Sequence, residues 1–213
     1  MPTALVTGST DGIGLETARQ LQARGWRVVV HGRDRERAGS ALKALARAGG
    51  GEASAVWGDL ASMPAVLDLA AQAGRAAPAL DVLMLNAGVY EANRALSPDG
   101  FERTMGINHF AHLLLSLRLR GALKAAAAPR VIWVSSGVHR GASLDLGDLD
   151  LARDWSGYGA YAASKLANAV SAAEMARRPD FEGVVSVSLH PGVVGTKLLT
   201  RNFGKGGVPI GEG

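Results

Sequence analysis

Six short apolar segments separated by helical patterns constrain the fold of this chain more than any other feature. Apolar residues run through these segments almost without a break, as in strands that are covered on both faces. Between the segments, apolar residues recur at helical spacing. This alternation predicts βα units, a parallel sheet and a doubly wound α/β fold with helices on both faces. The expected strands are residues 4–6, 28–30, 53–57, 82–85, 130–134 and 183–189, and the expected helices are 12–24, 35–48, 62–73, 99–127 (one helix, or two with a break near Gly121) and 158–177.

Length and composition limit the class of protein. The chain has 213 residues and no cysteine. Its length predicts a single domain over residues 1–213, and the absence of cysteine excludes a disulfide scaffold. The 28 glycines suit tight βα turns and close packing of helices on a sheet.

Charge and motif searches exclude several kinds of partner. The net charge of +4 is spread along the chain, which disfavours a nucleic-acid-binding protein. No H-E-x-x-H or Cys/His pattern occurs, so we expect no metal, and we interpret His109 and His112 as packing or surface residues. Met1-Pro2-Thr3 leads into an apolar run without the basic residues of a signal peptide, so we expect none, and no uninterrupted apolar stretch is long enough to span a bilayer. We therefore expect a cytoplasmic protein that binds neither nucleic acid nor a membrane.

A glycine-rich turn joins the first strand to the first helix. Its sequence is Gly8-Ser9-Thr10-Asp11-Gly12-Ile13-Gly14, a spacing of G-x-x-x-G-x-G. Gly8 would permit a sharp turn, Gly12 would let the backbone approach a pyrophosphate, and Gly14 would let the helix pack on the strand. The free N–H groups and the dipole of the helix N-terminus favour phosphates. A glycine-rich turn without a ligand is the alternative, but the position at the first βα junction favours a dinucleotide site.

The end of the second strand bears on the choice between two dinucleotides. An NAD site usually places an acidic residue there, where this chain has Gly32 followed by Arg33. A guanidinium can clamp a 2′-phosphate, and Ser9 and Arg35 could assist it. We therefore predict NADP(H) as the cofactor, with NAD(H) less favoured. The alternative is that Arg33 is a solvated loop residue, and the neighbouring Asp34 speaks for that alternative.

Tyr161 and Lys165 are four residues apart on a predicted helix and therefore share one face. An ammonium group near a phenol should lower the pKa of the phenol and make it a general acid/base near neutral pH. Ser136 ends the fifth strand and could donate a hydrogen bond to a substrate oxygen. Asn86-Ala87-Gly88 closes the fourth strand at the same edge, where ligands sit in a parallel α/β sheet.

Taken together, these motifs resemble those of the short-chain dehydrogenase/reductase family along the whole chain. A narrower similarity, to the branch that holds the retinol dehydrogenases, the WW-domain oxidoreductases and the protochlorophyllide reductases, lies in residues 99–102, 108–112, 164–168 and 190–194. The family motifs are Thr7-Gly8-x-x-x-Gly12-Ile13-Gly14, Asp59-Leu60, Asn86-Ala87-Gly88, Asn108, Ser135-Ser136, Tyr161-x-x-x-Lys165 and Pro191-Gly192-x-x-x-Thr196.

The resemblance implies a Rossmann-type fold and a catalytic role for four residues. Tyr161 would exchange a proton with a carbonyl or alcohol substrate, and Lys165 would lower its pKa and bind the nicotinamide ribose. Ser136 would polarise the carbonyl. Asn108 would hold a water molecule that links Lys165 to solvent.

The resemblance also implies contacts with the cofactor. Asp59 would bind the adenine amino group beside Leu60, Asn86 and Gly88 would line the cleft, and Thr196 would reach the carboxamide or the pyrophosphate. The remaining implied cofactor contacts are Thr10, Asp11, Ile13, Ala87, Pro191, Gly192 and Val194. Independently of the resemblance, the segment between Ser136 and Tyr161, with His139 and Trp155, is longer than a tight βα loop. We expect it to border the substrate entrance together with Val89, Tyr90 and Leu198, with an ordinary surface loop as the alternative.

The family further implies a homodimer formed through the long helices 99–127 and 158–177, with ordinary packing of these helices on the sheet as the alternative. Members also continue beyond Pro191-Gly192 with two helices and a seventh strand. We therefore expect that the sequence, which ends at Gly213, is truncated at its C-terminal end. The alternative is a trimmed member whose sixth strand is an exposed edge.

Two function classes fit these observations. The first is an NADP-dependent oxidoreductase that acts on a small carbonyl or alcohol substrate. The second is a catalytically silent dinucleotide-binding protein that senses redox state. The pair of Tyr161 and Lys165 favours the enzyme, because a binding protein has no need of it.

Overall fold

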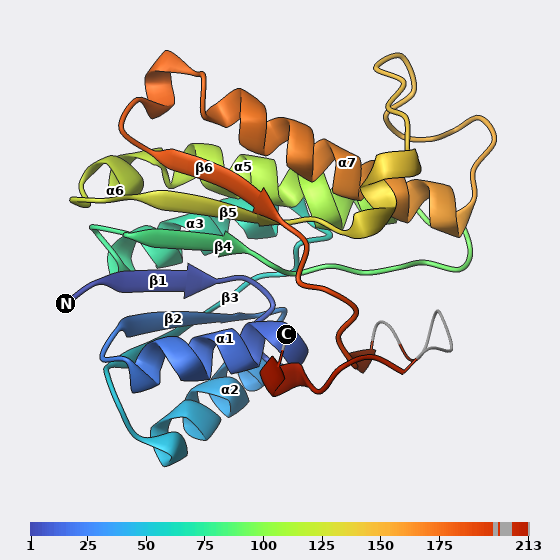
Figure 1. Cartoon of the computed structure of the whole chain (residues 1–213). Helices are drawn as coiled ribbons and strands as arrows, with labels where there is room; N and C mark the ends of the chain where they lie inside the picture. Colours follow the sequence, from blue (N-terminus) through green and yellow to red (C-terminus); the bar gives the residue numbers. More distant parts are fainter. Residues whose placement is uncertain (198–199, 201–205, 213) are drawn as a thin grey trace.

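A computed structural model describes residues 1–197, 200 and 206–212 (Figure 1). Within them, six strands form one parallel sheet in the order β3-β2-β1-β4-β5-β6. The strands are β1 (Thr3–Val6), β2 (Arg27–Gly32), β3 (Ala53–Trp57), β4 (Val82–Leu85), β5 (Arg130–Val134) and β6 (Val185–Leu189). The helices and helical turns are α1 (Gly12–Ala23), α2 (Arg35–Ala48), α3 (Met63–Ala76), α4 (Arg103–Met105), η1 (Gly106–Phe110), α5 (Ala111–Arg118), α6 (Arg120–Lys124), η2 (Gly137–Gly141), α7 (Gly157–Met175), η3 (Pro179–Phe181) and η4 (Ile210–Glu212). The doubly wound α/β fold is confirmed.

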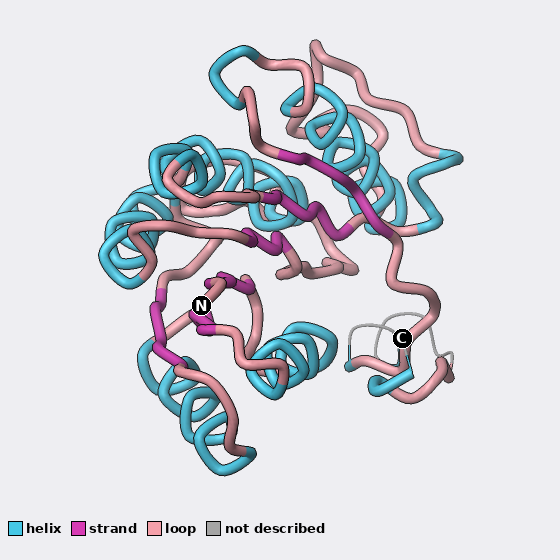
Figure 2. The backbone as a smooth tube through the Cα atoms, turned by 60° about the vertical axis from the view of Figure 1, so that its left-hand side comes forward, coloured by secondary structure: helices cyan, strands magenta, loops and turns pink. Residues whose placement is uncertain are grey.

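Helices cover both faces of the sheet, with α1 and α2 on one face and α3, α5 and α7 on the other (Figures 1 and 2). Neighbouring residues of one strand therefore enter different cores. Val28 and Val30 pack against Leu45 of α2, whereas Val29 joins the larger core that contains Leu115 of α5. This two-sided burial is the reason that the central strands β1, β2 and β4 read as continuous apolar runs, whereas the edge strand β6 is largely exposed.

The sheet order places a crevice between β1 and β4. From β1 the chain winds outward through β2 to β3, and it then returns to β4 and winds the other way to β6. The loops that follow β1 and β4 consequently diverge, and ligands of open α/β sheets bind at such a switch point. The glycine turn follows β1, and Asn86-Ala87-Gly88 follows β4.

The long helix expected over 99–127 is divided in the structure. It begins only at Arg103, because the buried Glu102 carboxylate caps it by accepting a hydrogen bond from the Met105 amide (2.7 Å). The π-helical turn η1 follows directly, and the helical path breaks at Leu119 before α6. The expected break near Gly121 therefore lies two residues earlier.

After β6, the chain crosses the carboxyl end of the sheet. Val194 pairs with Val208 in a parallel bridge, and η4 lies beside α1 (Figure 1). A Cβ atom on Gly12 would lie 3.5 Å from the Thr196 methyl group, so this crossing segment reaches the glycine turn. No helix in the described part of the chain is long and apolar enough to cross a membrane.

The Thr7 hydroxyl joins the ends of β1, β4 and the start of α5. It accepts hydrogen bonds from the amides of Asn86 (2.9 Å) and Ala87 (3.0 Å), and it lies 3.0 Å from His112 Nε2. His112 Nδ1 lies 3.0 Å from the Asn108 carbonyl oxygen, which can only accept. The proton of the neutral ring therefore sits on Nδ1, and Nε2 accepts the Thr7 hydroxyl proton.

We predict that Thr7→Val lowers the free energy of unfolding by about 3 kcal/mol, because it leaves two buried amides and a histidine nitrogen unsatisfied. Urea denaturation measures this change. Thr17→Val, on the half-buried side of α1, is the matched control and should change stability by less than about 0.5 kcal/mol. Equal stability of the two variants would contradict the role of the Thr7 hydroxyl.

Candidate active site

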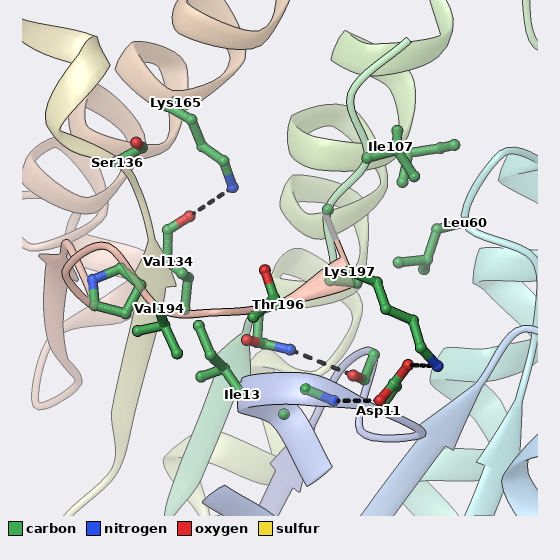
Figure 3. A pocket seen from close by; sticks show the side chains of 18 of the residues that line it. Asp11, Ile13, Leu60, Ile107, Val134, Ser136, Lys165, Val194, Thr196 and Lys197 are labelled. Carbon is green, nitrogen blue, oxygen red and sulfur yellow. Dashed lines mark hydrogen bonds and ion pairs between the residues drawn. The ribbon is translucent and has the colours of Figure 1, made fainter. Parts of the chain in front are cut away.

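A cleft of about 660 Å³ lies at the carboxyl ends of the strands and brings together nearly all of the predicted site residues. Ser9, Arg35, Tyr90 and Asn108 are predicted residues that do not line it. Figure 3 shows Ser136 and Lys165 on one side of the cleft and Asp11 and Ile13 on the other. The predicted residues that line it are Gly8, Thr10, Asp11, Gly12, Ile13, Gly14, Arg33, Asp59, Leu60, Asn86, Ala87, Gly88, Ser136, Tyr161, Lys165, Pro191, Gly192, Val194 and Thr196.

The glycine turn has the geometry that its sequence predicts. Gly8 and Gly12 have φ angles of 62° and 56°, in the left-handed region that favours glycine. A Cβ atom on Gly8 would lie 2.9 Å from the Ala87 backbone, and one on Gly14 would lie 2.5 Å from Asn86 Nδ2. Only glycine fits at these two positions, and the turn stays open to the cleft.

Asp11 places a carboxylate at the start of α1. It accepts a hydrogen bond from the Gly12 amide (2.8 Å) and forms an ion pair with Lys197 of the crossing segment (Figure 3). The carboxylate stabilises the helix N-terminus. The Lys197 ammonium offsets the negative charge that this carboxylate would otherwise present to a bound phosphate.

The end of β2 has no room for an acidic side chain. A Cβ atom on Gly32 would lie 2.6 Å from the Ala38 amide of α2. Arg33 and Arg37 are both exposed and both line the cleft. Asp34 instead caps α2 by accepting a hydrogen bond from the Arg37 amide (2.8 Å). Arg37 was not among the residues predicted from sequence to contact a cofactor, because only the residues next to the end of β2 were considered for that role.

Two expected helpers of Arg33 do not reach the cleft. Ser9 is fully buried. Its hydroxyl donates a hydrogen bond to the Val6 carbonyl (2.8 Å) and accepts one from the His31 amide (2.8 Å). The Arg35 guanidinium lies over the Trp57 ring, 5.5 Å from its centroid. Both predictions are corrected. The Ser9 hydroxyl links β1 to β2, and the Arg35 side chain packs on Trp57 of β3.

Asp59 and Leu60 lie where β3 ends. The Asp59 carboxylate accepts a hydrogen bond from the Ala61 amide (2.9 Å), which shapes the turn into α3. Ser62 caps α3 by accepting a hydrogen bond from the Ala65 amide (3.4 Å). Asp59 therefore presents its carboxylate to the cleft from a fixed turn.

Tyr161 and Lys165 meet as expected, but the pKa of the tyrosine shifts the other way. Burial raises the pKa of Tyr161, and a hydrogen bond with Ser136 opposes that shift. The Lys165 ammonium lies 5.5 Å from the centre of the Tyr161 ring and donates to the Val134 carbonyl (3.0 Å; Figure 3). The prediction of a lowered pKa was wrong, because loss of water around the phenol outweighs an ammonium directed at a backbone carbonyl.

Lys165 is a fully buried cation. Burial lowers the pKa of its ammonium from 10.5 to about 8. A Cβ atom on Gly88 would lie 3.4 Å from Lys165 Nζ, so this glycine keeps the ammonium accessible from the cleft. Such an ammonium is a ready hydrogen-bond donor for a polar ligand group.

Asn108 lies behind the wall of the cleft in the π-helical turn η1. Its side chain accepts from the Val89 amide (2.7 Å) and donates to the Val89 carbonyl (3.0 Å) and the Ser164 hydroxyl (3.0 Å). Those bonds use both of its N–H donors. These three hydrogen bonds satisfy the side chain and explain how a fully buried asparagine is accommodated in this helical segment.

The remaining sequence expectations can be placed as follows. Val89 lines the cleft, the Tyr90 ring lies 5.9 Å from that of Tyr161, and Leu198 lies outside the described residues. His109 and His112 are buried packing residues. Among the described residues, no cluster of three or more His, Asp or Glu could hold a metal ion.

Comparisons with known proteins agree with this geometry. A family model described as short chain dehydrogenase matches residues 2–205. Retinol dehydrogenase 14 of Mus musculus is 37% identical over 207 residues, covering 92% of this chain and 62% of its own length. Polyprenol dehydrogenase of the same species is 41% identical over 202 residues, covering 92% of this chain and 60% of its own length. The chain thus spans less than two thirds of these two relatives.

One solved structure of similar fold contains a bound dinucleotide. The short chain dehydrogenase from Burkholderia cenocepacia J2315, in complex with NADP, is 27% identical with a TM-score of 0.73. The match covers 92% of this chain and 76% of that one.

We predict that Lys165→Met raises the melting temperature at pH 7 by about 5 °C, because it removes a desolvated charge. The folded-state pKa of about 8 lies below the unfolded value of about 10.4. The unfolded chain therefore binds more protons between these values, and wild-type stability rises with pH across that window. The advantage of the variant should be fully present below pH 8 and shrink towards pH 10.

Thermal unfolding at pH 7, 8.5 and 10 measures this effect. Lys43→Met, at an exposed position of α2, is the matched control and should show no such pH dependence. A melting temperature of Lys165→Met at or below the wild-type value at pH 7 would contradict the prediction.

Proposed function

The chain belongs to the short-chain dehydrogenase family, in its retinol-dehydrogenase-like branch, and from that premise we propose that it is an NADP-dependent oxidoreductase. Its substrate would be a small molecule with a carbonyl or alcohol group. The observation that supports this most is the meeting of Tyr161, Ser136 and Lys165 in the cleft that also contains the glycine turn.

The residues of the cleft fit a dinucleotide. Gly8 and Gly12 take the left-handed φ angles that the turn requires, and the close contact of Gly14 with Asn86 brings the N–H groups at the start of α1 to the cleft. The buried Lys165 ammonium suits the hydroxyl groups of a ribose, and Asp59 suits an adenine amino group. A bound nicotinamide dinucleotide would supply or accept the hydride.

The chain's own residues would move the proton and orient the substrate. Because burial raises the pKa of Tyr161, its phenol is neutral at pH 7 and can donate a proton to a carbonyl oxygen. Ser136 would hydrogen-bond the same oxygen. Lys165 would stabilise the phenolate left behind. Asn108 would hold a water molecule that links Lys165 to solvent, as the family resemblance implies.

The walls of the cleft favour a substrate with an apolar body. Val89, Val138 and Val193 line it together with the polar groups named above.

We also propose a homodimer through α5 and α7, where Leu117 and Val170 are 39% and 51% exposed. This assembly stays a prediction.

We predict that Tyr161→Phe lowers turnover at least a hundredfold and leaves dinucleotide binding intact, because only the transferable proton is lost. NADPH consumption against a panel of aldehydes, ketones and quinones measures turnover, and fluorescence titration measures binding. Tyr158→Phe, at an exposed position of the same helix, is the matched control. Dinucleotide binding by a wild type without any turnover would favour the redox-sensing alternative.

We further predict that Arg33→Asp raises the KM for NADPH about tenfold or more and lowers the KM for NADH, because an acid repels a 2′-phosphate that an arginine attracts. Steady-state kinetics with both cofactors measures the preference. Arg35→Asp changes the same charge on the side that packs on Trp57 and should leave the preference unchanged. An unchanged preference in Arg33→Asp would reject NADP specificity through this residue.

A further inference from the structure

His31 is a buried histidine that the proposed chemistry does not use. It is 2% exposed, lines the cleft and precedes the crowded Gly32 on β2. Its ring lies between the glycine turn and the end of β3. A buried titratable side chain at this place needs a physical reason.

Two backbone groups determine the state of the His31 ring. The Gly8 amide donates to Nδ1 (3.1 Å), and Nε2 lies 3.0 Å from the Gly58 carbonyl oxygen. Because an amide only donates and a carbonyl only accepts, Nδ1 is the acceptor and Nε2 carries the proton. Burial lowers the pKa of the ring, which keeps this neutral form at pH 7. The ring is therefore a bridge of fixed polarity between the two loops.

Gly8 is held from both sides. His31 Nδ1 accepts a hydrogen bond from the Gly8 amide, and Asn86 Nδ2 donates one to the Gly8 carbonyl oxygen (3.4 Å). The backbone of His31 also binds Ser9, the next residue of the turn. The His31 amide donates a hydrogen bond to the Ser9 hydroxyl, and the His31 carbonyl accepts one from the Ser9 amide (3.1 Å). The orientation of the peptide before Gly8 thus depends on the histidine ring, and Gly8 begins the turn that leads to the free amides of α1.

We propose that His31 is a positioning residue for the phosphates of the dinucleotide, acting through its hydrogen bond with the Gly8 amide. The proposal rests on the proposed function, since it concerns the same cleft. His31 does not touch the chemistry at Tyr161. Its effect is on the geometry of the turn and therefore on the affinity for the adenosine half of the cofactor.

Two substitutions test the two hydrogen bonds of the His31 ring one at a time. His31→Asn keeps an acceptor near the place of Nδ1 and can retain the Gly8 bond. His31→Gln places its amide near Nε2 and can retain only the Gly58 bond. His109→Gln is the control, because His109 is also buried but pairs with Asn168 of α7 instead.

Calorimetric titration with NADP and with adenosine 2′,5′-bisphosphate measures affinity, and thermal unfolding of each variant measures stability. We expect His31→Gln to raise both dissociation constants about tenfold. His31→Asn should stay within about threefold of the wild type, and His109→Gln should bind like the wild type. A purely structural role would lower the stability of the two His31 variants without separating their affinities.

Equal binding by His31→Asn and His31→Gln, while the wild type binds NADP, overturns this inference and leaves the proposed function standing. A wild type that binds neither NADP nor NAD overturns the proposed function, and this inference with it. Nitrogen NMR of the wild-type ring at pH 7 tests the same bridge without any variant. A proton on Nδ1, or a charged ring, contradicts the assignment.

Discussion

The site depends first on one hydroxyl group, that of Thr7, because it joins three elements that the chain order keeps far apart. The hydroxyl accepts hydrogen bonds from the two backbone amides that begin the loop after β4. It donates a hydrogen bond to His112, at the start of α5. His112 in turn holds the carbonyl of Asn108. The strand that leads into the glycine turn and the helix that carries Asn108 are thereby fixed to one another without a charged group.

Most of the fold could be read from sequence because its central strands are buried on both faces. The apolar runs at Val28–Val30 and Val82–Leu85 report that burial directly, and Ser62 marks the start of its helix by capping chemistry. The region from Asp99 to Ala127 could not be read, because its pattern is helical throughout. The late start depends on a buried carboxylate, Glu102, whose burial is a tertiary fact.

The site was predictable where a residue acts through its own type and less so where its surroundings decide. Glycines at positions 8 and 14 and the pair of Tyr161 and Lys165 can be located by their spacing together with their order along the βα units. The direction of the Tyr161 pKa shift could not, since it depends on the water excluded around the ring. Ser9 looked like a ligand contact, although its hydroxyl is used to join β1 and β2.

The crowding at Gly32 limits how this protein can change by mutation. Any side chain there would press on the backbone of α2 and would need that helix to move. A single nucleotide change in the gene could not install an acid at this position without a cost in stability. Under the proposed role of Arg33, divergence in cofactor use would proceed through the exposed Arg33 and Arg37, where substitution disturbs little packing. In protein engineering, the same two positions are the natural place to randomise.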